Sequence, residues 1–321
     1  MTDFERYVLE EHVEDFDHGV INRRELLRRV TLITGSLTAT LAVLEVMGCG
    51  AAPSGSPATP VSRATSSPQP FATPPPQPTT DGITVQETDP RIKVDTLTVK
   101  GADGATLMSY FARPASNTRS APGIVVVHEN RGLLPHIKDV VRRVATAGFS
   151  GLSVDLLSRD GGAVQLSDPA AYAAALAKRP PADMVSDLEQ ALSALSGPGG
   201  AGQKLGMTGF CFGGGMVWQT LAAGAPLQAA VPYYGPAPSN LAGLASTRAA
   251  VFAVYAELDT RITSTRDAVE AQLKQDGRPV KVMVYPGVNH AFHNDTGAAY
   301  NAVQAEAAWT ATIQWFQQYV R

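Results

Sequence analysis

The chain has 321 residues, a formal net charge of −3 and a pI near 6.1, which excludes the strongly basic surface typical of nucleic-acid-binding proteins. Its two cysteines exclude a disulfide framework, and its hydrophobic content of 44% is typical of a globular enzyme. His290 and His293 stand without the further ligands of a zinc site, so we expect neither a metal nor another cofactor.

Residues 1–48 have the features of an export leader. An acidic stretch at 1–21, which favours a short helix, precedes the pair Arg23-Arg24 and the largely apolar segment Val30–Met47. Two arginines followed by apolar and basic residues before such a segment resemble a twin-arginine export signal. Val46-Met47-Gly48-Cys49 resembles a lipobox, in which a peptidase cuts before Cys49 and the thiol carries lipid.

Two alternatives to a cleaved leader stay open. In the first alternative, the apolar segment is an uncleaved membrane anchor, although Glu45 and many Thr, Ser and Gly residues make it a poor membrane span. It is an ordinary amphipathic helix in the second, although its apolar residues show little helical periodicity. The sequence favours export, with a lipid anchor on the outer face of the cytoplasmic membrane, in the periplasm or at the cell surface. The chain would then contact the membrane only through this lipid.

Residues 49–82 separate this leader from the rest of the chain. Pro, Ser, Thr and Ala dominate the segment, which contains three consecutive prolines at 74–76. Such a composition cannot bury a core, so it predicts a disordered, partly extended tether. A protein held off a membrane by a lipid needs such a spacer, and the globular domain is then expected at 83–321.

From residue 83 onward, strand and helix patterns alternate. The stretches 92–100 and 107–113 predict an antiparallel hairpin, and the β-branched runs 123–128 and 149–155 are typical of strands buried in a parallel sheet. This alternation predicts a doubly wound, mostly parallel α/β sheet with helices on both faces, whose functional sites form at the carboxyl ends of the strands. Helices are expected at 136–147, 182–195, 263–275 and 300–319, and further strands at 229–234, 250–255 and 280–285.

The most informative run is Gly209-Phe210-Cys211-Phe212-Gly213, between a short predicted strand and a helix that runs to about Ala223. Gly-x-nucleophile-x-Gly in this context is the nucleophile elbow of α/β-hydrolases, where glycines let strand and helix pack closely around a strained residue. The helix N-terminus favours a thiolate and an oxyanion. The alternative is a glycine-rich turn with a buried structural cysteine.

A hydrolase triad needs an acid and then a histidine after the nucleophile, each at the end of a strand. Asp259 follows the strand at 250–255, and His290 follows the strand at 280–285. His290 is expected to take and return the proton, while Asp259 holds the imidazole in one tautomer. Three alternatives stay open: Asp259 as a helix N-cap, Glu257 as the acid, and His293 as the base.

The third candidate loop is His128-Glu129-Asn130-Arg131-Gly132, which ends the strand at 123–128. This loop normally faces the elbow and gives one amide to the oxyanion hole, the other coming from the residue after the nucleophile. The backbone N–H groups of Asn130 and Phe212 are therefore candidates for that hole. Glu129 is then a carboxylate close to the thiol.

Together these residues resemble the dienelactone hydrolase (carboxymethylenebutenolidase) family over about residues 90–321. The resemblance lies in 128–132, 209–214, Asp259, 289–293 and Tyr233-Tyr234-Gly235. It implies that Glu129 pairs with the resting thiol and that substrate binding lets it help generate the thiolate. The thiolate then opens the lactone to an acyl-enzyme, which water hydrolyses. Candidate substrate-binding residues are Arg131, Tyr234 and Phe292.

One departure from the family concerns the arginines that bind the substrate carboxylate. Residues 293–295 hold no arginine, and the other family arginine aligns near Pro169. Candidate substitutes are Arg131, Arg159, Arg179 and Arg261, although the motif places none of them. A desolvated carboxylate without such a partner is costly. The sequence therefore favours another ester or lactone over dienelactone itself.

These observations predict a small-molecule ester or lactone hydrolase with a Cys-His-Asp triad. The alternatives are a non-catalytic binding lipoprotein on a hydrolase fold, and a thioesterase or peptidase on the same scaffold. The sequence carries no signal for the physiological substrate or the oligomeric state, and the fold of residues 156–180 around the pocket is left open.

Overall fold

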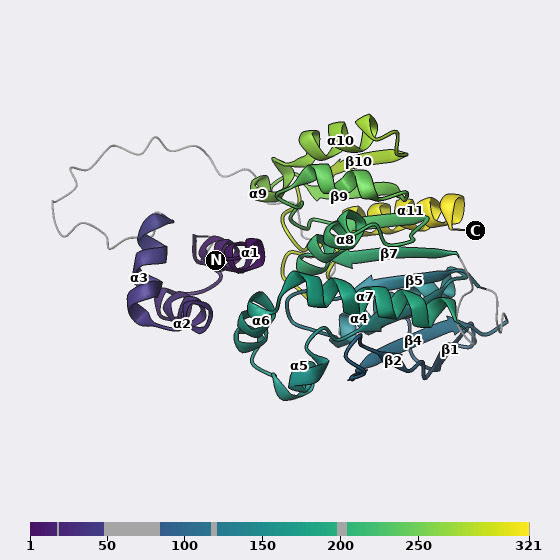
Figure 1. Cartoon of the computed structure of the whole chain (residues 1–321), viewed down its shortest axis with the longest axis horizontal. Helices are drawn as coiled ribbons and strands as arrows, with labels where there is room; N and C mark the ends of the chain where they lie inside the picture. Colours follow the sequence, from purple (N-terminus) through teal and green to yellow (C-terminus); the bar gives the residue numbers. More distant parts are fainter. Residues whose placement is uncertain (18, 48–83, 117–120, 198–203, 321) are drawn as a thin grey trace, which may run out of the picture.

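The computed structural model of the protein describes residues 1–17, 19–47, 84–116, 121–197 and 204–320. An eight-stranded sheet, in the order β1-β4-β6-β5-β7-β8-β9-β10, forms its centre (Figure 1). The strands are β1 (Ile92–Asp95), β4 (Ser109–Pro114), β6 (Ser150–Val154), β5 (Gly123–Val127), β7 (Leu205–Phe210), β8 (Ala229–Tyr233), β9 (Ala250–Ala256) and β10 (Val280–Tyr285).

All neighbours from β6 to β10 pair in parallel, whereas β4 pairs antiparallel with β1 and with β6. Every residue of β5, β6, β7, β8 and β9 is buried, as expected for parallel strands covered on both faces. The sheet confirms the predicted mostly parallel α/β architecture. The predicted hairpin is more elaborate than expected, because the small ladder of β2 (Val99–Lys100) and β3 (Thr106–Leu107) interrupts the connection between β1 and β4.

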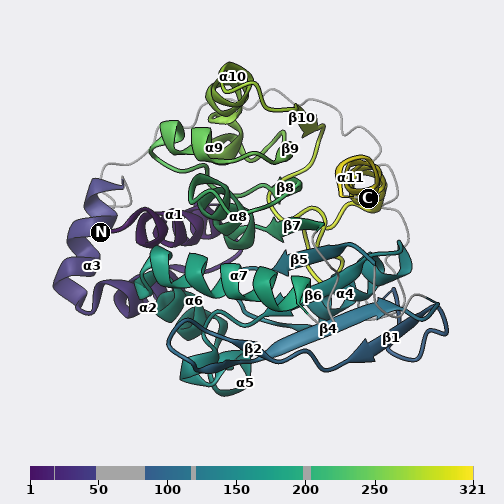
Figure 2. The ribbon, with the colours of Figure 1, turned by 45° about the vertical axis from the view of Figure 1, so that its right-hand side comes forward.

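Helices cover both faces of the sheet (Figure 2). On one face lie α7 (Pro181–Ser196), α8 (Phe212–Ala222) and α10 (Arg266–Gln275), and on the other α4 (Pro135–Thr146) and α11 (Ala302–Tyr319). The excursion after β6 contains a short 3₁₀ turn (Ser158–Asp160), α5 (Gly162–Gln165) and α6 (Pro169–Lys178), and a second 3₁₀ turn (Leu241–Ser246) precedes β9.

The helix predicted at 263–275 is two helices, α9 (Thr260–Thr263) and α10. The break has a local cause at the end of β9. Asp259 caps α9 by accepting from the backbone N–H of Ile262 at 3.3 Å, and the Thr263 hydroxyl donates to the carbonyl of Ala256 at 2.7 Å. These bonds hold the short α9 against the strand end, and α10 starts afresh beyond it.

Three helices precede the sheet: α1 (Asp3–Asp17), α2 (Arg23–Thr34) and α3 (Leu37–Val46). The apolar segment Val30–Met47 does not form one continuous helix, because Gly35 adopts a left-handed φ of 79° and Ser36 caps the next helix. Among the described residues no single helix is long and apolar enough to cross a membrane. Only α2 and α3 taken together pass that test, and they are bent by 108°.

These N-terminal helices pack against the sheet domain, with α1 and α2 beside α6 (Figures 1 and 2). Phe4, Tyr7, Leu26 and Val30 are among the residues they bury, while Arg23 and Arg24 of the predicted export motif stay exposed. Cys49 and the predicted tether at 49–82 lie outside the described residues. Lipidation and tethering therefore stay predictions.

Candidate active site

Cys211 occupies the turn between β7 and α8 in a strained conformation, with φ 58° and ψ −123°. Its N–H donates to the carbonyl of Tyr233 at 3.1 Å, which fixes the turn to the end of β8. A Cβ on Gly209 would collide with the carbonyl of Gly213, and one on Gly213 would lie 2.5 Å from the carbonyl of His128. The glycines are thus required by the close approach of strand and helix, as the elbow pattern predicts.

His290 and Asp259 lie next to this turn, in the loops after β10 and β9. The Nδ1 of His290 is 2.7 Å from Oδ2 of Asp259, whose side chain is fully buried. The Cys211 sulfur and a ring nitrogen of His290 lie within 4.8 Å of each other. The structure therefore brings together the three residues of the predicted triad. Asp259 serves two functions, because its other oxygen caps α9.

The two alternative residues lie elsewhere. Glu257 is exposed and accepts a hydrogen bond from the backbone of Gly287 at 2.8 Å, in place of a contact with the imidazole. His293 is 1% exposed and stacks on Phe210 with 4.9 Å between ring centroids. Burial lowers the pKa of His293 well below its ordinary value, which keeps the ring neutral within the aromatic core.

The charges of the site act on the thiol in opposite directions. Burial raises the pKa of Cys211, and the Glu11 carboxylate raises it further, while His290 lowers it. Burial alone would lower the pKa of His290, but the Cys211 sulfur and the hydrogen bond with Asp259 raise it well above its ordinary value. Burial and the Glu11 carboxylate therefore oppose formation of the thiolate, whereas His290 promotes it.

The loop after β5 lies on the far side of the nucleophile. Phe212 is the first residue of α8, so its N–H is one of the amides that a helix leaves without an intrahelical acceptor. Asn130 is 8% exposed and lies beside the nucleophile in the lining of one cavity. The two residues nominated for the oxyanion hole thus lie close to Cys211: Phe212 at the N-terminus of α8, and Asn130 in the loop after β5.

The candidate substrate-binding residues separate into two groups. Arg131 lines a cavity of about 250 Å³ that also contains Cys211 and His290. Tyr234 and Phe292 are 1% and 0% exposed, pack ring against ring at 5.5 Å, and are absent from the lining of this cavity. The structure thus places Arg131 at the site and the two aromatic residues in the layer beneath it.

Helix α1 adds two side chains that sequence reasoning missed. The Tyr7 hydroxyl lies 3.2 Å from the Cys211 sulfur and 3.5 Å from Nε2 of His290. The Glu11 carboxylate accepts from the side-chain amide of Asn130 at 3.0 Å and lies 3.8 Å from the sulfur. The i, i+3 and i+7 spacing of Phe4, Tyr7 and Glu11 indicates a shared helix face, but that spacing alone does not say what the face contacts.

Three possible metal ligands meet at this point in the described part of the chain. Glu11, Cys211 and His290 each offer an atom within 4.8 Å of the others. A thiolate, an imidazole and a carboxylate are ligand types that zinc accepts. The cysteine and the histidine, however, already have partners in the triad arrangement, and the glutamate comes from the N-terminal helix.

A family model described as the dienelactone hydrolase family matches residues 107–320, which include the sheet from β4 to β10 with its elbow, acid and histidine. The chain belongs to the dienelactone hydrolase family. This confirms the resemblance inferred from the motifs and shows that the protein is a lactone or ester hydrolase.

Individual relatives agree with the dienelactone hydrolase assignment. A protein of Escherichia coli O157:H7, provisionally named carboxymethylenebutenolidase, is 32% identical over 229 residues, covering 68% of this chain and 84% of that protein. A similarly named protein of Methylorubrum extorquens is 33% identical over 223 residues, covering 66% of this chain and 76% of its own. A crystal structure from Klebsiella pneumoniae, provisionally named dienelactone hydrolase, is 30% identical with a TM-score of 0.65, covering 71% of this chain and 99% of that one.

One dienelactone hydrolase feature differs from the expectation. The resemblance implies that Glu129 pairs with the resting thiol, but its carboxylate accepts from the side-chain amide of Asn294 at 2.7 Å. No hydrogen bond joins Glu129 to Cys211 within the described residues, and Glu11 of α1 lies beside the sulfur instead. Glu129 still raises the pKa of the thiol through its charge, but less than Glu11 does.

Proposed function

We propose that the chain hydrolyses a carboxylic ester or lactone through a Cys211-His290-Asp259 triad and a covalent acyl-enzyme. The observation that carries this proposal is the 2.7 Å contact between His290 and Asp259 beside a cysteine held at φ 58° in an elbow. Asp259 accepts from Nδ1, which leaves Nε2 of His290 available to take the thiol proton.

Each step of the proposed reaction conserves atoms and charge. His290 takes the proton of Cys211, and the thiolate adds to the acyl carbon while the amides of Phe212 and Asn130 hold the oxyanion. The carbon–oxygen bond of the ester then breaks, and the imidazolium gives its proton to the leaving alkoxide. Water, deprotonated by His290, attacks the thioester, releasing the carboxylic acid and restoring Cys211. A lactone gives one ring-opened product instead of two.

Substitution of the nucleophile tests this mechanism. We expect Cys211→Ala to abolish hydrolysis of small activated esters, because Cys211 is the only thiol among the described residues and it occupies the elbow. Circular dichroism and melting temperature must match those of the unaltered chain, since Cys211 is 3% exposed and its loss also removes packing. Hydrolysis that persists at a comparable rate in the folded variant contradicts the covalent mechanism.

We also propose that the chain is exported and anchored by lipid at Cys49. The support is the twin-arginine pattern, whose Arg23 and Arg24 are exposed on α2, followed by the lipobox-like residues up to Cys49. Expression in a bacterium fed a labelled fatty acid tests this, with Cys49→Ala as the control. Label in the unaltered chain alone supports the anchor, whereas a full-length, unlabelled chain in the cytoplasm contradicts it.

A further inference from the structure

The N-terminal helix α1 lies directly over the reacting atoms. The Tyr7 hydroxyl is 3.2 Å from the Cys211 sulfur, and Glu11 is bonded to Asn130, whose backbone is expected to stabilise the oxyanion. A reacting acyl carbon has to come within about 3–3.5 Å of the sulfur. Because the Tyr7 hydroxyl already occupies that shell, substrate and α1 compete for the same place.

The space that α1 leaves at the site is small and negatively charged. The cavity beside Cys211 has a volume of about 250 Å³, below the usual range of about 300–1,000 Å³ for small-molecule pockets. Four carboxylate side chains line it: Glu11, Glu14 and Asp15 from the N-terminal segment, and Glu129 from the sheet domain. Because Arg131 and His290 line the same cavity, α1 leaves the site narrow and predominantly acidic rather than uniformly negative.

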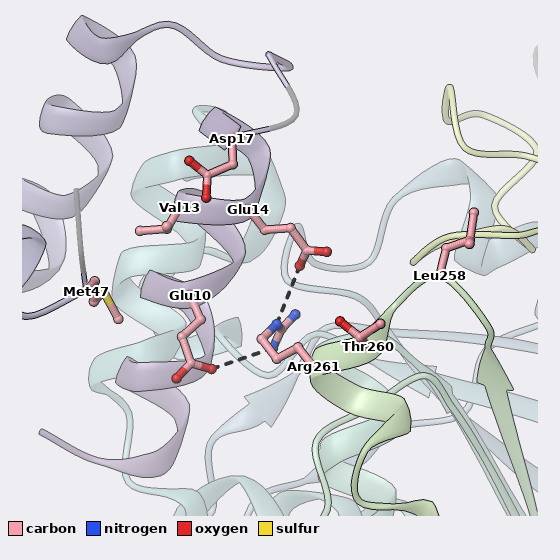
Figure 3. A pocket seen from close by; sticks show the side chains of 8 residues that line it. All are labelled: Glu10, Val13, Glu14, Asp17, Met47, Leu258, Thr260 and Arg261. Atoms are coloured by element: carbon pink, nitrogen blue, oxygen red, sulfur yellow. Dashed lines mark ion pairs between the residues drawn. The ribbon is translucent and has the colours of Figure 1, made fainter.

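Both apolar packing and ion pairs hold α1 on the sheet domain, and its Phe4, Tyr7 and Val8 belong to the buried core. Phe4 packs on Phe212 with 4.7 Å between ring centroids, and the Arg261 guanidinium lies 4.7 Å from the centre of the Tyr7 ring. Arg261 also faces the carboxylates of Glu10 and Glu14, at 3.9 and 3.5 Å. Figure 3 shows these two ion pairs at the edge of a cavity of about 500 Å³ between α1 and the start of α9. The seam is thus incompletely packed where the charges meet.

The segment that covers the site is also the segment that the lipobox pattern marks for removal. Helix α3 ends at Val46, and cleavage before Cys49 would detach α1, α2 and α3 together. The dienelactone hydrolase match begins only at residue 107, so these helices lie outside the family domain. The occlusion seen in the structure and the cleavage point predicted from the sequence concern the same residues.

We propose that helices α1, α2 and α3 form an inhibitory cap that keeps the active site closed until they are cut away or displaced; the catalytic consequence rests on the hydrolase mechanism proposed above. Tyr7 takes the place of the substrate at the nucleophile, while Glu11 fastens α1 to the Asn130 side chain and its charge disfavours the thiolate. The full-length chain is thus latent, and processing releases an open enzyme.

The test uses the full chain with Cys49→Ser, so that Cys211 is the sole thiol, and with a protease recognition sequence inserted between residues 50 and 80. Two rates are measured before and after cutting, at nanomolar protein: alkylation of Cys211 by iodoacetamide, followed by intact mass, and hydrolysis of a small activated ester. A cap that is open about 1% of the time slows both about 100-fold. Cutting is therefore expected to raise both rates together.

Two variants of the uncut chain provide the matched comparison. The double substitution Glu10→Gln and Glu14→Gln removes the charges that face Arg261, and we expect it to speed alkylation of Cys211. Asp17→Asn removes one negative charge from the same helix at the edge of the same cavity, but no ion pair joins Asp17 to Arg261 in the described structure. It is expected to leave the rate unchanged.

The outcomes separate the cap from the chemistry. Faster alkylation on cutting without ester hydrolysis would support the cap and refute the hydrolase mechanism. Alkylation of Cys211 that is equally fast before and after cutting would overturn the cap. If cutting unfolds the protein, the uncut variants decide: the Glu10/Glu14 double variant must be alkylated faster than the Asp17 variant, and equal rates would overturn the proposal.

Discussion

Replacing Asp259 by asparagine isolates the role of the triad carboxylate. Asparagine is as good an N-cap as aspartate, so its oxygen is expected to keep the bond to Ile262 at the start of α9. Its amide would donate to Nδ1 of His290, where Asp259 now accepts at 2.7 Å. The imidazole proton is then forced onto Nε2, which can no longer take the proton of Cys211. The variant should fold normally and lose activity.

The expected loss in kcat/KM is about 10³- to 10⁴-fold, as for other triads with a misplaced histidine proton. This corresponds to about 4–5 kcal/mol of transition-state stabilisation, whereas loss of the N-cap interaction alone would cost only about 1 kcal/mol of folding stability. The assay is hydrolysis of an activated ester by the cut chain, with thermal unfolding followed in parallel.

Glu257→Gln is the matched control for this experiment, because Glu257 lies two residues away in the same loop but bonds to the backbone of Gly287. Its kcat/KM should stay close to that of the unaltered chain. If Asp259→Asn retained kcat/KM within about tenfold of the unaltered chain, the reasoning would be refuted. The imidazole would then not depend on Asp259 for its tautomer.

Two further predictions concern charge. Glu11→Gln should lower the pKa of Cys211, because the Glu11 charge raises it. The pH midpoint for alkylation of Cys211 in the uncut chain is then expected at lower pH, and an unchanged midpoint contradicts this. Asp139→Ala should lower the free energy of unfolding by about 3–5 kcal/mol, because it removes the buried carboxylate that pairs with Arg142 and Arg143 and accepts from the N–H of Val85. A loss below about 1 kcal/mol in urea unfolding contradicts this.

The parts of the fold that follow from the sequence are those with strong local signals. The run at 123–127 is apolar and β-branched, and it forms the central strand β5 as predicted. Cys211, Asp259 and His290 were each placed after a strand, and parallel strands bring their carboxyl ends to one edge. Short-range pattern and topology together were therefore sufficient to assemble the three residues.

The parts that the sequence did not reveal depend on long-range packing. Residues 1–21 indicate a helix, but nothing in their spacing shows that Tyr7 lies against Cys211, 204 positions away. In the same way, a glutamate at a strand end does not show whether it turns toward the thiol or toward Asn294, as Glu129 does. Such choices are decided by which surfaces remain uncovered once the sheet has formed.

Intact mass spectrometry of the cut chain during turnover of a small activated ester tests the central claim most directly. The account predicts one acyl group on Cys211 that appears within the first turnovers, disappears when the ester is exhausted, and never forms in the Cys211→Ala variant. Steady hydrolysis with no adduct, or with an adduct on another residue, would contradict covalent catalysis by Cys211.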